Sequence, residues 1–431
     1  MSEWKELKIE DFCEVIGGGT PSTKEDSYYG GDISWITPRD LTNYKNRFIS
    51  RGERNISDLG LKNSSAKILP KNSILLTSRA PIGYLAIAEN EVCTNQGFKS
   101  LIVDAAKADY NFVYYLIKSN VERIKVLGTG TTFAEISGSV VKGLKFTIPN
   151  LPTQTAIAEI LSSLDDKIEL NNKINQELET LAQTLFKKWF IDFEFPNENG
   201  EPYKSSGGEM VESELGEIPK GWEIVKVQDL EHKLQTGTRP KGGVGGITQG
   251  VPSIGAESIK KLGYYDFSKV KFVTEEFAAK MKRGKVEGYE LLIYKDGGKP
   301  GTFIPHFSMF GEGFPFDSFF INEHVFLLDF FNKHFNSFCY FYFDSEYVKP
   351  VFENNGGKAA IPGINQEDVK NLWVFNPNLE AVKLFGEFAH SSVSTILKNC
   401  KENIQLTNLR DSLLPKLISG ELEVSQTQTT A

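Results

Sequence analysis

The chain has 431 residues, of which 40% are hydrophobic and 24% charged; packed globular domains share this composition, which argues against a disordered protein. A chain of this length is expected to form two or more domains. The net charge of −8 excludes a uniformly basic nucleic-acid binder, so any binding to DNA must use local basic surfaces.

The first 150 residues alternate strand-like runs with turn signals. KILPKNSILLTS at 67–78 and KSLIVD at 99–104 predict strands, and YNFVYYLIKSNVERIKVL at 110–127 predicts a helix. The first residues contain no apolar stretch, and no apolar run approaches the ~20 residues that span a membrane. We therefore expect a mixed α/β domain over 1–150, in a cytoplasmic protein without a signal peptide.

A long helix is predicted next, over 151–191. Its apolar positions are spaced alternately four and three residues apart, which is the seam of a coiled coil. Pro152 lies at the start, where proline is tolerated, and no further glycine or proline interrupts the run before Pro196. Such a stripe needs a partner helix. The predicted seam residues of this helix are Leu164, Ile168, Asn171, Asn175, Leu178 and Leu185.

The second half of the chain repeats the first. WKELKIED at 4–11 matches WEIVKVQD at 222–229, an offset of 218, and the segments that enter the two long helices match at an offset of 228. We expect an exposed linker at 192–221, a second mixed domain at 222–377, a second long helix at 378–422 and a flexible tail at 423–431. The seam residues predicted for the second helix are Ile396, Asn399, Asn403, Leu406, Leu413 and Leu417.

The asparagines fall on the same heptad positions in both helices, which is a pattern that fixes register and partner choice at some cost in stability. The chain order of domain, helix, domain and helix favours a second helix that runs back along the first. The fold class is therefore α+β: two homologous mixed α/β domains separated by two long helices that form an antiparallel coiled coil with approximate two-fold symmetry.

We find no convincing catalytic or metal-binding signature. The four cysteines are scattered without a CxxC pair, the five histidines are dispersed, and GGGTPST at 17–23 lacks the GK[ST] end of a phosphate-binding loop. Free buried thiols, no catalytic residues and no metal site are expected.

Two related but different domains held apart by a spacer suit the reading of two short DNA targets at a set separation. Loop residues such as Arg, Lys and Thr could reach phosphates and base edges, although each of them taken singly could be an ordinary solvated residue. In the second half, Glu257, Ser258 and Asp296 lie in the same loops as these candidates. The candidate DNA-binding residues are Thr20, Thr37, Arg39, Ser78, Arg79, Thr129 and Thr131 in the first half, and Thr238, Arg239, Lys241, Lys295, Lys299 and Lys358 in the second.

The chain resembles the specificity subunits of type I restriction-modification systems over essentially its whole length. Three of the stretches that carry this resemblance are LTSRAPIGYLAIAENEVCTNQGFKSLIV, ELGEIPKGWEIVKVQDL and LRDSLLPKLISGELEV; the fourth is the first long helix with its continuation KKWFIDF. The resemblance implies a non-catalytic subunit with two target-recognition domains, each reading half of a bipartite, asymmetric DNA site.

The resemblance also implies partners. The helices would dock two methyltransferase subunits, which use S-adenosylmethionine, and the complex would include restriction/translocase subunits, which use ATP and Mg. This chain would itself bind no cofactor.

Two alternatives remain open at this point, namely a helical scaffold that does not read DNA and a stand-alone enzyme. In the second domain KDGGKPGTF replaces SRAPIGYL, so that Lys295 or Lys299 is expected to take the place of Arg79.

Overall fold

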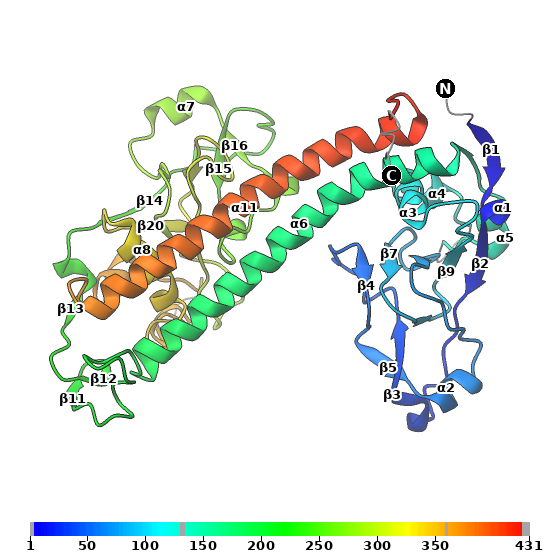
Figure 1. The fold of residues 1–431 in the computed structure, drawn as a ribbon. Helices are drawn as coiled ribbons and strands as arrows, with labels where there is room; N and C mark the ends of the chain where they lie inside the picture. The colour runs from blue at the N-terminus through cyan, green and yellow to red at the C-terminus, as the bar shows by residue number, and fades with distance from the viewer. Residues whose placement is uncertain (1–3, 130–133, 358–360, 425–431) are drawn as a thin grey trace, which may run out of the picture. The chain divides into compact units, whose positions relative to one another are not determined.

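The computed structural model describes residues 4–129, 134–357 and 361–424, and it divides into two compact units. The first unit comprises Met1–Glu169 and Gln405–Ala431, and the second comprises Leu170–Ile404. Two long helices, α6 (Leu151–Phe186) and α11 (Glu380–Ser419), each contribute a segment to both units (Figure 1). The predicted mixed α/β fold with two long helices is confirmed.

The first unit contains three small sheets with helices packed around them. Their strand orders are β2-β9-β6-β7-β4, β5-β3-β8 and β1-β10. The strands are β1 (Lys5–Lys8), β2 (Cys13–Gly17), β3 (Tyr29–Ile36), β4 (Phe48–Ile49), β5 (Arg54–Ile56), β6 (Ile74–Leu76), β7 (Leu85–Ala88), β8 (Cys93–Thr94), β9 (Lys99–Val103) and β10 (Lys145–Ile148). The α-helices before α6 are α1 (Ile9–Phe12), α2 (Asp58–Lys62), α3 (Tyr110–Ser119), α4 (Val121–Val126) and α5 (Gly138–Lys142).

The second unit repeats most of this topology; its main sheet has four strands in the described residues, without a counterpart of β4, and a further hairpin lies at 210–219. Its sheets have the orders β14-β20-β17-β18, β16-β15-β19 and β13-β21. The strands are β13 (Ile224–Lys226), β14 (Lys233–Thr236), β15 (Val251–Ile254), β16 (Phe272–Val273), β17 (Leu291–Tyr294), β18 (Phe307–Ser308), β19 (Phe320–Ile321), β20 (Val325–Asp329) and β21 (Trp373–Phe375). The α-helices before α11 are α7 (Glu275–Lys280), α8 (Lys333–Phe343), α9 (Lys349–Gly356) and α10 (Gln366–Lys370).

Strand register shows how closely the two units correspond. β3 pairs in parallel with β8 through Trp35 and Cys93, and β15 pairs in parallel with β19 through Ser253 and Phe320. Trp35 and Ser253 are separated by the 218 residues of the sequence repeat. The internal repeat is therefore a repeat of backbone topology as well as of sequence.

Two expectations about single elements need correction. The helix predicted over 110–127 is two helices, because Asn120 leaves the helical conformation at a φ of −111° and its side chain donates a hydrogen bond to the Leu116 carbonyl at 2.8 Å. The segment 192–221 is more than an exposed linker, because it contains a hairpin of β11 (Met210–Ser213) and β12 (Gly216–Pro219). Phe193 and Ile218 from this segment are buried in the core of the second unit. Most residues of this segment are polar, so its composition resembled that of a linker and did not indicate that two apolar side chains are buried.

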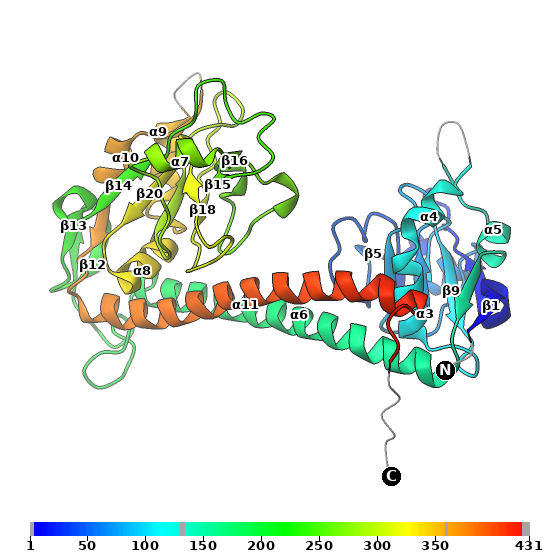
Figure 2. The ribbon, with the colours of Figure 1, turned by 90° about the horizontal axis from the view of Figure 1, so that it is seen from above.

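The core of the second unit is rich in aromatic side chains. The aromatic-rich run at 333–343 forms α8, which packs against the beginning of α11 (Figure 2). The Phe338 and Phe385 rings lie 6.1 Å apart and nearly perpendicular. Such edge-to-face pairs add specific geometry to the burial of apolar area, so α8 fixes the first turns of α11.

The two long helices are antiparallel where they meet. In the second unit the Asn171 side-chain amide donates to Asn403 at 2.9 Å, and Asn399 donates to Asn175 at 2.8 Å. In the first unit Leu161 and Leu414 share one buried core. Partner numbers rise along one helix as they fall along the other, which is the antiparallel order.

The other predicted seam residues are buried to different extents. Ile396 and Leu417 are buried, whereas the side chains of the remaining apolar positions are partly exposed, namely Leu164, Ile168, Leu178, Leu185, Leu406 and Leu413. Fully buried neighbours such as Ala182 and Phe186 widen the stripe. The helices pack against α3 and α8 as well as each other, so the buried surface is broader than a two-helix seam.

The four cysteines are free, and Cys13, Cys93 and Cys339 are buried. Burial raises the pKa of the Cys13 thiol to about 12 and that of Cys400 to about 11. Within the described part of the chain no group of His, Cys, Asp and Glu side chains could hold a metal ion. No helix among those residues is long and apolar enough to cross a membrane.

Candidate nucleic-acid interface

Five segments of the first unit converge in one cluster. Three backbone hydrogen bonds join them: the N–H of Asn95 donates to the carbonyl of Ile36 at 3.0 Å, that of Ser78 to the carbonyl of Gly97 at 2.7 Å, and that of Ile136 to the carbonyl of Ser78 at 3.0 Å. A Cβ atom at position 97 would lie 2.9 Å from the Pro38 ring, so glycine permits this approach. We call this cluster the first crown; it comprises residues 18–20, 37–40, 78–79, 95–99 and 134–136.

The charged side chains of the first crown are held by partners. Arg79 lies 3.5 Å from Glu135, which also meets Lys99 at 3.4 Å. Arg39 lies 3.6 Å from Glu53, and its side chain is 83% exposed. An ion pair as exposed as that of Arg39 contributes little to stability, so this guanidinium group can exchange its partner for another anion or acceptor; the Arg79 side chain is 34% exposed and remains accessible.

The structure gives the other predicted residues of the first half more structural roles. The Thr37 hydroxyl donates to Asp40 at 2.6 Å and closes a turn, and the Thr20 hydroxyl donates to Gln96. Ser78 is 1% exposed, and Thr129 exchanges backbone hydrogen bonds with Glu135 at 3.0 and 3.1 Å. Thr131 lies outside the described residues.

Four members of the first crown were missed by the sequence reasoning. They are Asn95, Gln96, Lys99 and Glu135. The first three lie in TNQGFK, inside a stretch that carries the family resemblance, and this stretch was the available signal. Glu135 gives no such signal, because only the fold brings it to Arg79.

The second unit has a crown with the same hydrogen-bonded frame. The backbone N–H of Asn322 donates to the carbonyl of Ile254 at 2.9 Å, that of Lys295 to the carbonyl of His324 at 3.1 Å, and that of Ile364 to the carbonyl of Lys295 at 2.9 Å. The side-chain oxygen of Asn322 accepts from the His324 amide at 2.9 Å, as that of Asn95 accepts from the Gly97 amide at 2.8 Å. We call the matching residues the second crown: 236–241, 255–258, 295–296, 322–324 and 363–364.

This frame corrects one expected equivalence. Lys295 occupies the position of Ser78. The backbone carbonyl of each accepts from an isoleucine, Ile364 or Ile136, and the backbone amide of each donates to the turn that holds His324 or Gly97. Arg79 forms an isolated antiparallel bridge with Glu135, and Asp296 forms one with Gly363. The counterpart of Arg79 is therefore Asp296 rather than Lys295 or Lys299.

The second crown has its own ion pairs. Arg239 lies 3.5 Å from Glu323, and Asp296 contacts His324 and lies 3.0 Å from Lys295. Lys241 and Lys299 are exposed, and Thr238 is half-buried. Lys358 lies outside the described residues.

A small polar cleft of about 150 Å³ lies within this crown. Glu257, Lys271, Asn322 and His324 are among the residues that line it. Burial opposes ionisation of Glu257, but its hydrogen bond from Lys271 and a backbone amide outweigh burial and lower its pKa. The cleft therefore presents an ionised carboxylate beside an amide and an imidazole.

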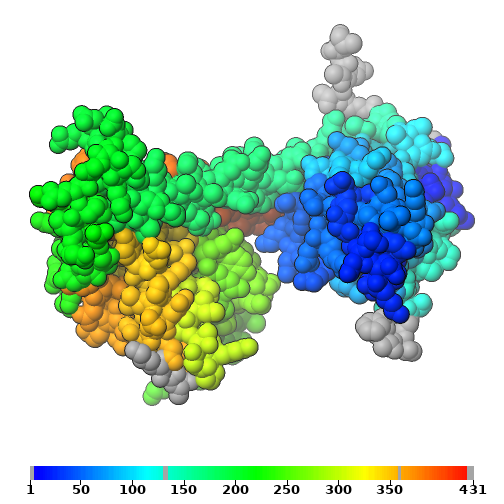
Figure 3. Space-filling model, turned by 90° about the horizontal axis from the view of Figure 1, so that it is seen from below, coloured from blue at the N-terminus to red at the C-terminus, as the bar shows by residue number. Residues whose placement is uncertain are grey.

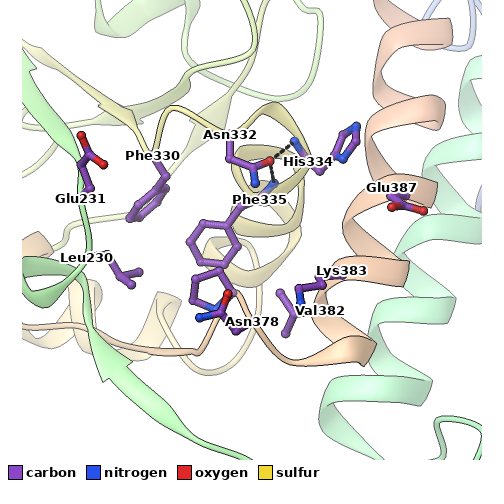
Figure 4. Close-up of a pocket in the computed structure, with 11 residues that line it drawn as sticks. Leu230, Glu231, Phe330, Asn332, His334, Phe335, Asn378, Val382, Lys383 and Glu387 are labelled. Atoms are coloured by element: carbon purple, nitrogen blue, oxygen red, sulfur yellow. Dashed lines mark hydrogen bonds between the residues drawn. The ribbon is translucent and has the colours of Figure 1, made fainter.

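Another cleft, of about 440 Å³, lies away from the crown, where the start of α11 meets α8 (Figure 4). Its floor is made by Phe330, Phe335 and Val382, and Asn332 caps α8 by accepting from the His334 and Phe335 amides at 3.0 and 3.1 Å. Phe330 and Phe335 pack edge to face at 4.8 Å. Asn332, one of the polar residues that line this cleft, therefore serves to cap α8.

Comparisons with known proteins agree with this organisation. Residues 1–180 match the family model described as the type I restriction modification DNA specificity domain. The chain is 35% identical to the type I restriction enzyme MjaIX specificity subunit of Methanocaldococcus jannaschii, over 98% of this chain and 94% of that protein. It is 32% identical to the HindI specificity subunit of Haemophilus influenzae over 45% of this chain and 42% of that one.

Among solved structures, the S subunit of a type I restriction-modification system from M. genitalium aligns with a TM-score of 0.63 at 17% identity, covering 96% of both chains. This similarity concerns the fold. The family assignment rests on the M. jannaschii relative, and it leaves the alternatives of a scaffold that does not read DNA and of a stand-alone enzyme unsupported. The chain belongs to the family of type I restriction-modification specificity subunits, the non-catalytic components that give these systems their DNA specificity.

Proposed function

We propose that each crown reads one half of a bipartite, asymmetric DNA site. The observation that carries this proposal is the shared backbone frame with different side chains: four corresponding hydrogen bonds recur in both crowns, while Arg79 becomes Asp296 and Gly97 becomes His324. A common frame gives both crowns the same approach to a DNA groove, and different side chains give them different base preferences.

The recognition domains are taken to be 1–150 and 222–377. In support, β1 pairs with β10 and β13 pairs with β21, so the first and last strands of each domain are joined. The helical segments 151–191 and 378–422 then serve as spacer and docking surface. The hairpin segment 192–221 and the tail 423–431 complete the chain.

The docking role of the helices is supported by apolar side chains left uncovered on them. Leu170 and Leu181 on α6 are 52% and 53% exposed, and Leu384 and Leu409 on α11 are each 47% exposed (Figure 3 shows part of the uncovered surface of α6). We assign this surface to two methyltransferase subunits, which would use S-adenosylmethionine. Restriction/translocase subunits, with ATP and Mg, would join the same complex in the cytoplasm.

The test is methylation profiling of genomic DNA from cells that express the chain with its methyltransferase partner. One gapped motif with two unlike halves is expected. Alanine at Arg39 and Arg79 should weaken or alter the first half only, since both side chains belong to the first crown. Lys145→Ala is the matched control, because Lys145 forms an exposed ion pair with Glu6 at 2.8 Å on the β1-β10 sheet.

Methylation without any sequence preference would contradict the proposal. So would a change in both half-sites when only the first crown is altered. The Lys145 variant should return the unaltered motif with unchanged efficiency.

A further inference from the structure

The two crowns carry ion pairs of reversed polarity at equivalent positions. In the first crown Arg39 pairs with Glu53. In the second crown Glu257 pairs with Lys271. Both members are displaced by the 218 residues that separate the repeats, so cation and anion have exchanged places on one framework.

At a second place only one charge is exchanged, because Arg79 corresponds to Asp296 while its partner Glu135 corresponds to Gly363. Arg79 lies 3.5 Å from Glu135, whereas its counterpart Asp296 contacts His324 and lies 3.0 Å from Lys295. At both places the first crown places a guanidinium where the second places a carboxylate. One reversed ion pair and one exchanged charge thus lie in matching loops of the two crowns.

The two carboxylates of the second crown, Glu257 and Asp296, are held by neighbouring groups and remain partly exposed. A Cβ atom at Gly255 would lie 2.3 Å from Oε2 of Glu257 and 2.7 Å from Nδ2 of Asn322, so the absent side chain leaves room for both groups. The side chain of Glu257 is 38% exposed and that of Asp296 is 23% exposed, so both retain access to a partner. Lys271 and Lys295 offset the repulsion that a carboxylate would otherwise meet near phosphates.

The chemistry of the DNA major groove separates these two sets of side chains. Guanine presents the acceptors N7 and O6, which suit the forked donors of arginine. Cytosine presents an exocyclic amine at N4 and adenine presents one at N6, which are donors that a carboxylate can accept from. A carboxylate is a poor partner for the acceptor edge of guanine.

We propose that Arg39 and Arg79 contact guanine in the first half-site, and that Glu257 and Asp296 accept hydrogen bonds from the exocyclic amines of cytosine or adenine in the second. This assignment rests on the proposed function of the crowns and adds the residues that set the choice of base. Asn322 positions the crown turn by accepting from His324, and Lys271 and Lys295 hold the two carboxylates.

The experiment uses the full complex with its methyltransferase partner and compares Glu257→Gln, Asp296→Asn and Arg79→Gln with the unaltered chain by methylation profiling. The first two variants keep size and shape and remove the negative charge. Each is expected to lower discrimination by roughly 10- to 100-fold at one base pair of the second half-site, the usual range for a lost base contact. Arg79→Gln should do the same in the first half-site.

Glu312→Gln is the control in the second unit, because Glu312 forms an exposed ion pair with Lys333 at 2.6 Å, outside the crown. A variant that no longer methylates DNA is titrated with duplexes altered at one base pair at a time. Loss of discrimination at a single position supports the proposal, and uniform weakening at all positions overturns it. Thermal melting of each complex separates misfolding from lost recognition.

The experiment distinguishes failure of the proposed function from failure of the base assignment alone. If the unaltered complex shows no two-part motif, the proposed function fails. If it shows the motif but Glu257→Gln and Asp296→Asn leave every base preference unchanged, only the present assignment fails. A first half-site without guanine, or a second without adenine or cytosine at the affected position, also overturns it.

Discussion

One pair of equivalent positions on the long helices is charged in the first unit and apolar in the second. In the first unit Asp165 on α6 pairs with Arg410 on α11, accepts a hydrogen bond from Tyr115 at 2.7 Å and lies 3.8 Å from Lys118. The Asp165 side chain is 8% exposed.

The repeat offset of 228 relates these positions to Val393 and Ala182. Both of these residues are fully buried in the core of the second unit. The same helix positions thus hold a buried ion pair in one unit and two small apolar side chains in the other.

The difference shows how a duplicated fold can make the packing of its helices specific. Apolar packing is non-directional, and it stabilises any helix that presents the right volume. A buried ion pair is weak support for stability, but it is costly to break, because a lone buried charge remains. We therefore expect the first unit to accept few substitutions at this pair of helix positions, and the second unit to tolerate exchange of one apolar residue for another.

The largest effect is expected from moving the charge to the wrong unit. Val393→Asp buries a carboxylate among apolar side chains, and it should destabilise the second unit by more than about 4 kcal/mol. Hydrogen exchange in α8 reports this unit. Val393→Thr, of similar volume but uncharged, should cost only about 1–3 kcal/mol; equal losses for both variants would show that shape rather than charge matters.

Removing the charge of Asp165 in the first unit comes next. Asp165→Ala leaves Arg410, whose side chain is 14% exposed, without its buried partner, and it should cost about 3–5 kcal/mol in the first unit. Hydrogen exchange in α3 measures this. Asp411→Ala is the matched control, since Asp411 also pairs with Arg410 but is 56% exposed, and its loss should cost no more than about 1 kcal/mol.

A smaller effect follows from transplanting the apolar pair. Asp165→Val combined with Arg410→Ala removes both charges and reproduces the residues of the second unit. We expect a cost about 2 kcal/mol below that of Asp165→Ala alone, because no lone arginine remains. Denaturant unfolding of the single and double variants completes the cycle, and simple additivity of the two losses would refute the coupling.

The smallest effect is the response to acid. Burial opposes ionisation of Asp165, but Lys118, Arg410 and the Tyr115 hydroxyl together bring its pKa below the ordinary value of 3.8. A lowered pKa contributes stability that is present above pH 3.8 and is lost as the pH falls through the lower, folded-state value. Each pKa unit between the unfolded and folded values corresponds to about 1.4 kcal/mol of lost stability, and the loss should vanish in Asp165→Asn when unfolding is followed from neutral to acid pH.

Sequence patterns predicted the features that depend on periodicity. The heptad spacing indicated both long helices, and the repeat offsets related the two helices to each other, including the asparagines that pair in the second unit. Features that depend on tertiary contact were not accessible. Nothing in the local pattern shows that Glu135 meets Arg79, or that the polar run around Phe193 and Ile218 is anchored in a core.

The candidate site followed the same rule. The loops were located correctly as loops, but the pairing of Arg79 with Asp296 needed the hydrogen bonds of Ser78 and Lys295, because insertions near Lys299 blur the sequence alignment. Equivalence of position is a property of the backbone frame, which a single sequence reveals only where the spacing is constant.

The raised thiol pKa values of the cysteines have a practical consequence. A thiol reacts as its thiolate, so Cys13 and Cys400, with pKa values near 12 and 11, are slow toward maleimides and iodoacetamides at neutral pH. Cysteines introduced at exposed sites, one in each crown, would therefore be labelled selectively without first removing the native ones. A fluorophore pair attached in this way would follow the engagement of cognate DNA in real time.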